Sequence, residues 1–213
     1  MKHVPHVVVA APWPDGRLPL TVVQWRHLTK VLRRKQGEPI TYTDGLGMFG
    51  TGVLGHQEIE RGEEVTRDRA HELTVAVAPP SNKDRQRFLV EKLAELGVAR
   101  LIWLRTRHGA NRVSSSTKVF TWMLAAVEQS RGAWLMETSG DLLELADLAG
   151  RVVVCHPGGE DTPYAGIDVV VVGPEGGFAE DEIPPEYERW GLGDNILRVE
   201  TAAIAAVARI SSG

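Results

Sequence analysis

The chain has 213 residues, of which 43% are hydrophobic, and this is enough to build the core of one large domain or two small ones. A net charge of −4 excludes a protein coated uniformly in positive charge, although basic residues cluster in two stretches, 26–35 and 83–112. No segment has the length of a membrane span, the apolar run near the start is too short for a signal peptide, and the single cysteine, Cys155, fits a reducing compartment. We therefore expect a cytoplasmic protein that contacts no membrane.

The first seventy residues predict a small, mainly β domain with one helix. The helix is expected in "TVVQWRHLTKVLRRKQG", where the apolar Val23, Leu28, Val31 and Leu32 fall near a helical stripe and Gly37 can end it. Strands are expected in "EPITYTD" and "GTGVLG", on either side of the turn "DGLG". The charged stretch that follows contains few large apolar residues, so the last strand or linker of this domain lies around residues 60–71.

From Leu73 onward, strands alternate with helices. The strand "LTVAVAPP" precedes the helix "KDRQRFLVEKLAEL", which Ser81 or Asn82 caps and Gly97 ends. The strand "ARLIWLRT", the helix "TKVFTWMLAAVEQS" and the strands "RVVVCHP" and "DVVVVGPEGG" follow. Continuously apolar strands between helices indicate a parallel sheet covered on both faces, and hence an α/β domain over residues 71–213.

Ligands bind beyond the carboxyl ends of the strands in such a sheet, so three glycine-containing stretches are candidates for one site. These are "CHPGG", "GPEGGF" and "LGDNILRVETA". The fingerprints of dinucleotide sites and P-loops are missing, and Glu175 would repel a phosphate, so a positive or neutral ligand fits better. No second histidine or cysteine has the spacing of a metal ligand, and we expect no metal.

The two loop motifs "GPEGGFAEDEI" and "LGDNILRVETAAIAA" resemble the paired signature of the SPOUT-type ribosomal RNA uridine N3-methyltransferases, the RsmE-like family. Three further stretches agree with this resemblance: "HLTKVLRRKQGE" with "TDGLG", "KDRQRFLVEKLAELGVARLIWLRTR", and "AAVEQSR". The resemblance runs from about His27 to the last residues.

The resemblance implies a PUA-like β-barrel domain that binds RNA, over residues 1–70, and a SPOUT methyltransferase domain with a trefoil knot, over residues 71–213. It implies a homodimer that binds S-adenosylmethionine in the knot and releases S-adenosylhomocysteine. The implied substrate is N3 of a uridine in the 16S ribosomal RNA of the small ribosomal subunit, and the usual target of the family is uridine 1498.

The resemblance also assigns residues to a cofactor pocket and to catalysis. Arg198, expected at the end of an apolar strand, stabilises a developing uridinate or forms a salt bridge between subunits, and Glu175 accepts a proton or orders the loop. His156, expected in a loop just before a proline, lines the pocket or is an ordinary, partly buried histidine, and the glycine loop is a tight turn if no ligand binds there. The expected cofactor-binding residues are His156, Gly173, Pro174, Glu175, Gly176, Gly177, Leu192, Gly193, Leu197 and Thr201.

The expected RNA contacts are basic side chains that otherwise form a solvated face, and they would address phosphates. They are Arg26, Lys30, Arg33, Arg34, Arg107 and Arg131. Gly132 and Met136 stand where relatives carry arginine and proline, and Gly213 ends the chain early, which predicts a short last helix and a weaker dimer interface. The alternatives are therefore a catalytically silent RNA-binding protein of the same fold and a knotted transfer RNA methyltransferase.

Overall fold

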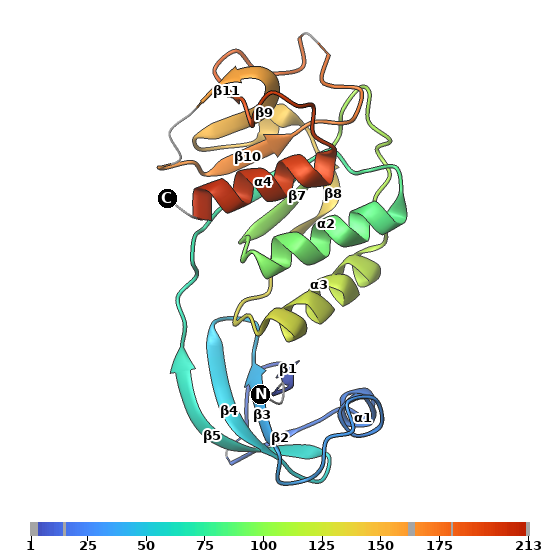
Figure 1. Cartoon of the computed structure of the whole chain (residues 1–213), viewed down its shortest axis with the longest axis vertical. Coiled ribbons are helices and arrows are strands. Elements are labelled where there is room, and N and C mark those ends of the chain that lie inside the picture. The colour runs from blue at the N-terminus through green and yellow to red at the C-terminus, as the bar shows by residue number, and fades with distance from the viewer. Residues whose placement is uncertain (1–3, 15, 162–164, 180, 212–213) are drawn as a thin grey trace. The chain divides into compact units, whose positions relative to one another are not determined.

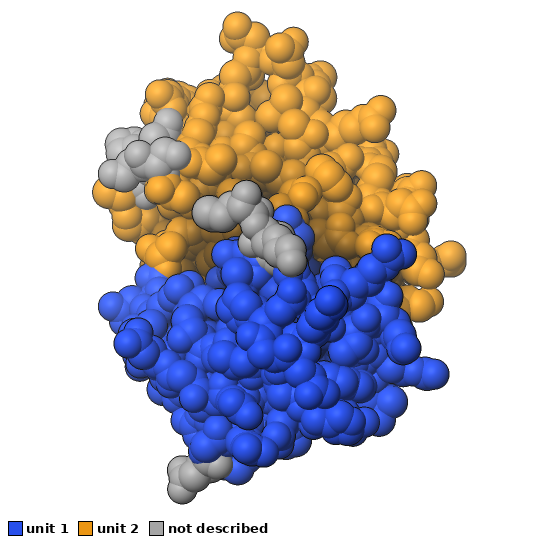
Figure 2. Space-filling model, turned by 60° about the horizontal axis from the view of Figure 1, so that its bottom comes forward, with its two compact units in different colours: residues 1–69, 124–135 blue, residues 70–123, 136–213 orange. Residues whose placement is uncertain are grey.

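The computed structural model describes residues 4–14, 16–161, 165–179 and 181–211. The chain forms two compact units, residues 1–69 with 124–135 (unit 1) and residues 70–123 with 136–213 (unit 2), which Figure 2 distinguishes by colour. The sequence-based division assigned residues 124–135 to the second domain, whereas in the structure they join unit 1. Helix α3 (Ser116–Ser130) therefore contributes residues to both units.

Unit 1 contains a five-stranded mixed sheet in the order β1-β3-β4-β5-β2, which curls in Figure 1. Its strands are β1 (His6–Val8), β2 (Arg17–Pro19), β3 (Pro39–Thr43), β4 (Met48–Leu54) and β5 (Glu58–Thr66). Only β1 and β3 pair in parallel, and the other neighbours are antiparallel. The two predicted strands are confirmed as β3 and β4. The predicted turn between them is confirmed as well, and in it Asp44 Oδ1 accepts hydrogen bonds from the amides of Leu46 and Met48.

Backbone pairing explains why residues 124–135 join unit 1. The amide of Leu135 donates to the carbonyl of Gly45 at 2.8 Å, and the amide of Gly47 donates to the carbonyl of Ala133 at 3.0 Å. The Thr43 hydroxyl also donates to Ala133 O at 2.9 Å. These bonds connect segments far apart in the sequence, and no periodicity in the chain could have revealed them.

The predicted helix of unit 1 forms, but most of its expected apolar stripe is exposed. It consists of α1 (Val22–Arg26) and a π-helical turn, η1 (His27–Val31). Leu28 is fully buried, whereas Val23 is 77% exposed and Val31 65% exposed. A π turn takes an additional residue, so apolar positions on its two sides no longer share one face.

The end of this helix also differs from the prediction. Arg33, with φ of 53°, takes the left-handed position after the last turn, and Gly37 lies beyond it. The amide of Arg34 donates back to the carbonyl of Leu28 at 2.9 Å, which completes the cap.

Unit 2 contains a six-stranded sheet in the order β11-β9-β10-β6-β7-β8, and every neighbouring pair is parallel. Its strands are β6 (Thr74–Val77), β7 (Arg100–Leu104), β8 (Glu137–Leu143), β9 (Val152–Glu160), β10 (Val169–Val172) and β11 (Glu188–Trp190). The predicted parallel α/β sheet is confirmed. The all-valine β10 is buried on both faces, which is why its sequence is continuously apolar.

Helices α2 (Lys83–Glu95) and α4 (Val199–Ser211) pack against each other, and α4 lies along β10 (Figure 1). Asn82 caps α2 by accepting a hydrogen bond from Asp84 N at 2.7 Å, and Gly97 follows the helix with φ of 74°, as predicted. The alanines of α4 allow close packing, since Ala203 and Ala206 are fully buried. A short 3₁₀ turn, η2 (Leu145–Asp147), precedes β9.

The positions of two predicted site segments need correction. His156 and Pro157 lie within β9 and not in a loop after it. Arg198 directly precedes α4 and does not end an apolar strand, because residues 195–198 form no strand and Ile196 is 86% exposed. The last described residue is Ser211, so the prediction about Gly213 lies outside the described residues.

Candidate functional site

The carboxyl ends of β9 and β10 open into a cavity of about 280 Å³ within unit 2. Its walls come from β9, the loop after β10, the segment before α4 and the first turn of α4. The lining residues are Cys155, His156, Pro157, Val172, Gly173, Pro174, Glu175, Gly177, Phe178, Leu192, Gly193, Asn195, Ile196, Leu197, Val199 and Ala202. The three stretches that the sequence singled out therefore meet around one cavity.

Glycine is required at two places in these walls. A Cβ on Gly173 would lie 2.6 Å from the ring of Phe178, so the missing side chain lets that ring pack against the end of β10. Gly193 has φ of 131°, a conformation that residues with a Cβ rarely adopt. Both glycines therefore shape the cavity.

The cavity is mostly apolar, and its polarity comes from a few groups. Among its lining residues, Glu175 is the one acidic side chain, and no lysine or arginine lines it. Burial raises the pKa of the Cys155 thiol to about 12, so this thiol stays protonated near neutral pH. The cavity therefore suits a ligand with apolar parts and a positive centre.

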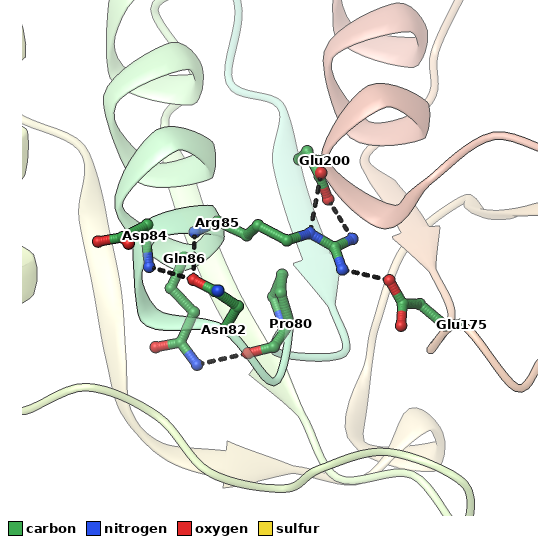
Figure 3. Close-up of polar contacts among 7 residues, drawn as sticks. All are labelled: Pro80, Asn82, Asp84, Arg85, Gln86, Glu175 and Glu200. Atoms are coloured by element: carbon green, nitrogen blue, oxygen red, sulfur yellow. Dashed lines mark hydrogen bonds and ion pairs between the residues drawn. The ribbon is translucent and has the colours of Figure 1, made fainter.

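Arg85, from the first turn of α2, connects two walls of the cavity (Figure 3). Its Nε donates to Glu200 Oε1 at 2.9 Å and its Nη2 donates to Glu200 Oε2 at 2.6 Å, while Nη1 contacts Glu175 Oε1. Burial alone would raise the pKa of Glu200, but the hydrogen bonds from Arg85 and from its own backbone, with the charges of Arg85 and Arg198, lower it below its ordinary value. The pair is therefore charged near neutral pH.

The loop after β10 also contacts the segment that follows β7. His108 Nδ1 lies 3.2 Å from the carbonyl oxygen of Gly177. Arg107 forms two hydrogen bonds to Asp181, at 2.6 and 2.9 Å, and these bonds lower the pKa of that carboxyl group. A second cavity of about 400 Å³, which Arg107 and Arg105 line, lies at this end of β7.

Most of the predicted cofactor residues lie together. His156, Gly173, Pro174, Glu175, Gly177, Leu192, Gly193 and Leu197 all line the first cavity. Gly176 does not line it, and a Cβ on this residue would lie 3.2 Å from the Cβ of His108. Thr201 does not line it either, and this residue is exposed on α4. Arg198 is exposed and also lies outside the lining.

The predicted RNA-contacting residues fall into separate groups. Arg26 and Lys30 are exposed on the helix of unit 1 and Arg33 is exposed just after it, whereas Arg34 is partly buried with its Nη1 3.8 Å from Glu38. Arg131 belongs to unit 1 and has φ of 61°, and Arg107 belongs to unit 2.

Sequence reasoning missed Arg85 and Phe178. Arg85 lies far from the loops in sequence, and nothing in the helix "KDRQRFLVEKLAEL" distinguishes it from Arg87. Phe178 ends the glycine motif itself, and its position beside Gly173 depends on the loop geometry.

Within the described ranges, no group of three or more His, Cys, Asp or Glu side chains could hold a metal ion. Nor does any described helix have the length and apolarity needed to cross a membrane.

Residues 67–211 match the RNA methyltransferase domain family, and the chain belongs to this family. It is 28% identical to the ribosomal RNA small subunit methyltransferase E of Rickettsia conorii, over 65% of this chain and 63% of that protein. It is 27% identical to the enzyme of the same name from Mycobacterium bovis, over 86% of this chain and 82% of that protein. A solved structure of ribosomal RNA small subunit methyltransferase E from Neisseria gonorrhoeae, bound to S-adenosylmethionine, superposes with a TM-score of 0.83 at 25% identity, covering 99% of this chain and 98% of that one.

Proposed function

We propose that this protein transfers a methyl group from S-adenosylmethionine to N3 of a uridine in 16S ribosomal RNA, the usual target of the family being uridine 1498. The observation that carries the proposal is the cavity at the carboxyl ends of β9 and β10, enclosed by the glycine loop and the segment before α4. Membership of the RNA methyltransferase domain family supports it, as do the names of the relatives and the cofactor bound in the Neisseria structure.

The lining of the cavity fits S-adenosylmethionine. Phe178, Leu192 and Leu197 supply apolar surface for an adenine ring, and the glycine loops expose backbone groups that can bind polar parts of the cofactor. Glu175 supplies the one negative charge of the lining, which favours a cationic ligand. When bound, the cofactor supplies an electrophilic methyl group on a positively charged sulfur.

The residues of the chain then have to orient the uridine and stabilise the charge that develops on its base. Arg198 is exposed immediately before α4, and its positive charge can stabilise a uridine that has lost the N3 proton. Glu175 is held by Arg85, which favours the loop-ordering role over proton transfer for this carboxylate. We assign Arg198 as the catalytic residue on this basis.

Residues 1–70, which make up most of unit 1, are proposed to be a PUA-like RNA-binding domain. Residues 71–213, which include all but the first residue of unit 2, are proposed to be the SPOUT methyltransferase domain, with the trefoil knot implied by the resemblance. The exposed cations Arg26, Lys30 and Arg33 support contacts with RNA phosphates in unit 1. Arg107 supports a contact near the target nucleotide, where an RNA phosphate would compete with Asp181 for its guanidinium. We further propose that the protein acts as a homodimer in the cytoplasm.

The test is transfer of a labelled methyl group from S-adenosylmethionine to small ribosomal subunits that lack the modification, followed by nucleoside analysis. We expect labelled 3-methyluridine, lost in Arg198→Ala and retained in Arg87→Ala, whose side chain is exposed on α2 away from the cavity. Label in another nucleoside, or label only in transfer RNA, would contradict the proposed substrate, which is N3 of a uridine in 16S ribosomal RNA. RNA binding with no methyl transfer would identify a catalytically silent protein.

A further inference from the structure

The loop between Gly173 and Phe178 contains three glycines, and a glycine-rich segment loses more conformational entropy on ordering than any other. Within the loop, one backbone hydrogen bond forms a turn, in which Gly177 N donates to Pro174 O at 2.9 Å. At its end, Phe178 packs against the core of the sheet. Among the residues that the structure describes, two side chains from elsewhere in the fold form hydrogen bonds to this loop, those of Arg85 and His108. His108 is exposed, so its single contact competes with water.

The Arg85 side chain is better fixed than that of His108, although its contact with Glu175 is open to solvent, since the Glu175 side chain is 59% exposed. Its guanidinium forms a bidentate ion pair with Glu200, which is only 7% exposed. The helices that carry these two residues, α2 and α4, pack against each other. A planar guanidinium has five donors in a rigid arrangement, so two can hold Glu200 while a third reaches Glu175 (Figure 3).

We propose that Arg85 is a positioning residue, which binds the glycine loop to the start of α4 through Glu175 and Glu200 and so keeps the cofactor cavity formed before the cofactor arrives. The inference rests on the proposed function, because it assumes that this cavity binds S-adenosylmethionine. Arg85 itself is not among the residues that line the cavity. It therefore acts on the ligand through the loop.

This role has a specific thermodynamic signature. If the loop without Arg85 adopts its binding conformation only part of the time, the apparent Kd of any ligand of the cavity rises by the inverse of that fraction. The factor is then equal for the cationic S-adenosylmethionine and for S-adenosylhomocysteine, which lacks the sulfonium charge. A charge effect on the ligand itself would change the two constants unequally.

The experiment measures both dissociation constants by calorimetry on the full-length protein, well below its unfolding temperature, for wild type, Arg85→Met and the control Arg87→Met. Arg87 lies on the same helix and pairs with Glu91 at 2.7 Å on the exposed surface. We expect Arg85→Met to raise the Kd of S-adenosylhomocysteine about tenfold, or about 1.4 kcal/mol. The Kd of S-adenosylmethionine should rise less, because loss of the guanidinium charge beside Glu175 favours the cationic ligand. Arg87→Met should leave both within twofold of wild type, and Arg85→Lys should recover part of the loss.

Arg85→Met leaves Glu200 buried without its partner, so the double variant Arg85→Met with Glu200→Gln removes that charge as well. It should fold and bind both ligands more weakly by the same factor, about tenfold, because Glu175 remains unheld and the two substitutions together leave the net charge unchanged. Wild-type affinity in the folded Arg85 variants would overturn the inference, and so would a loss confined to S-adenosylmethionine. If wild type binds neither ligand, the proposed function fails instead.

Discussion

Acidification is expected to destabilise the protein through His6, a buried side chain of unit 1. The residue is 4% exposed, and its Nε2 lies 3.1 Å from the carbonyl oxygen of Gly132, which can only accept. The proton of the neutral ring is therefore assigned to Nε2, and Nδ1 accepts from the Thr41 hydroxyl at 2.9 Å. Burial lowers the pKa of His6 to about 4, and the charges of Arg67 and Arg131 act in the same direction, against the hydrogen bond to Gly132.

The magnitude follows from the difference between the folded and unfolded pKa values. The unfolded pKa is 6.5, so the unfolded chain binds the proton more readily than the folded chain. The stability contributed by neutral His6 is complete above about pH 6.5 and is lost as the pH falls towards 4. Linkage gives a loss of unfolding free energy of about 2 kcal/mol by pH 5 and about 3 kcal/mol once both states are protonated.

The assay is urea unfolding of the full chain at about pH 7.5 and about pH 5, for wild type, His6→Gln and the control His56→Gln. His56 is exposed in the same unit, so its removal should leave the pH dependence unchanged. Carboxylates contribute equally in all three proteins and cancel in the comparison. Between about pH 7.5 and about pH 5, the free energy of unfolding of His6→Gln should fall by about 2 kcal/mol less than that of wild type. Equal pH dependence in His6→Gln and wild type would refute the argument.

Three further outcomes are expected. Gly173→Ala would place a Cβ 2.6 Å from the ring of Phe178 and displace it, which should cost about 1–3 kcal/mol of stability in thermal unfolding and weaken S-adenosylmethionine binding in calorimetry. Glu175→Gln should keep its contact with Arg85 but weaken S-adenosylmethionine about fivefold more than S-adenosylhomocysteine, since only the former bears the sulfonium charge; equal effects on both would contradict the proposed electrostatic role. Lys30→Ala should lower the slope of log affinity for RNA against log salt by about 0.7–0.9 in filter binding, and an unchanged slope would remove this residue from the RNA contacts.

Local rules determined much of the molecule before its structure was considered. The apolar strands predicted the parallel sheet because a strand covered on both faces must be apolar at every position, as β10 is. The sequence predicted the ends of α2, at Ser81 or Asn82 and at Gly97, because cap chemistry and backbone freedom act within a single turn, and the structure identifies Asn82 as the cap. The loop motifs predicted one cavity because strands of a parallel sheet end at a common edge.

Other features depended on contacts that cross long stretches of sequence. Residues 124–135 join unit 1 through backbone bonds to the turn at residues 44–47, which no local pattern encodes. The apolar positions of the first helix do not share one buried face, because the extra residue of a π turn separates the faces of the positions on its two sides.

Some features of the site also follow from the sequence alone, and others depend on the tertiary structure. The sequence by itself determined that the cavity would be lined by glycine loops and a carboxylate, since those residue types carry their own conformational and charge preferences. Only the tertiary structure decided that Gly176 and Thr201 face away from it and that Arg85 connects its walls. The physical reason is that an ion pair between α2, the loop after β10 and α4 exists only after the sheet has brought these three segments together.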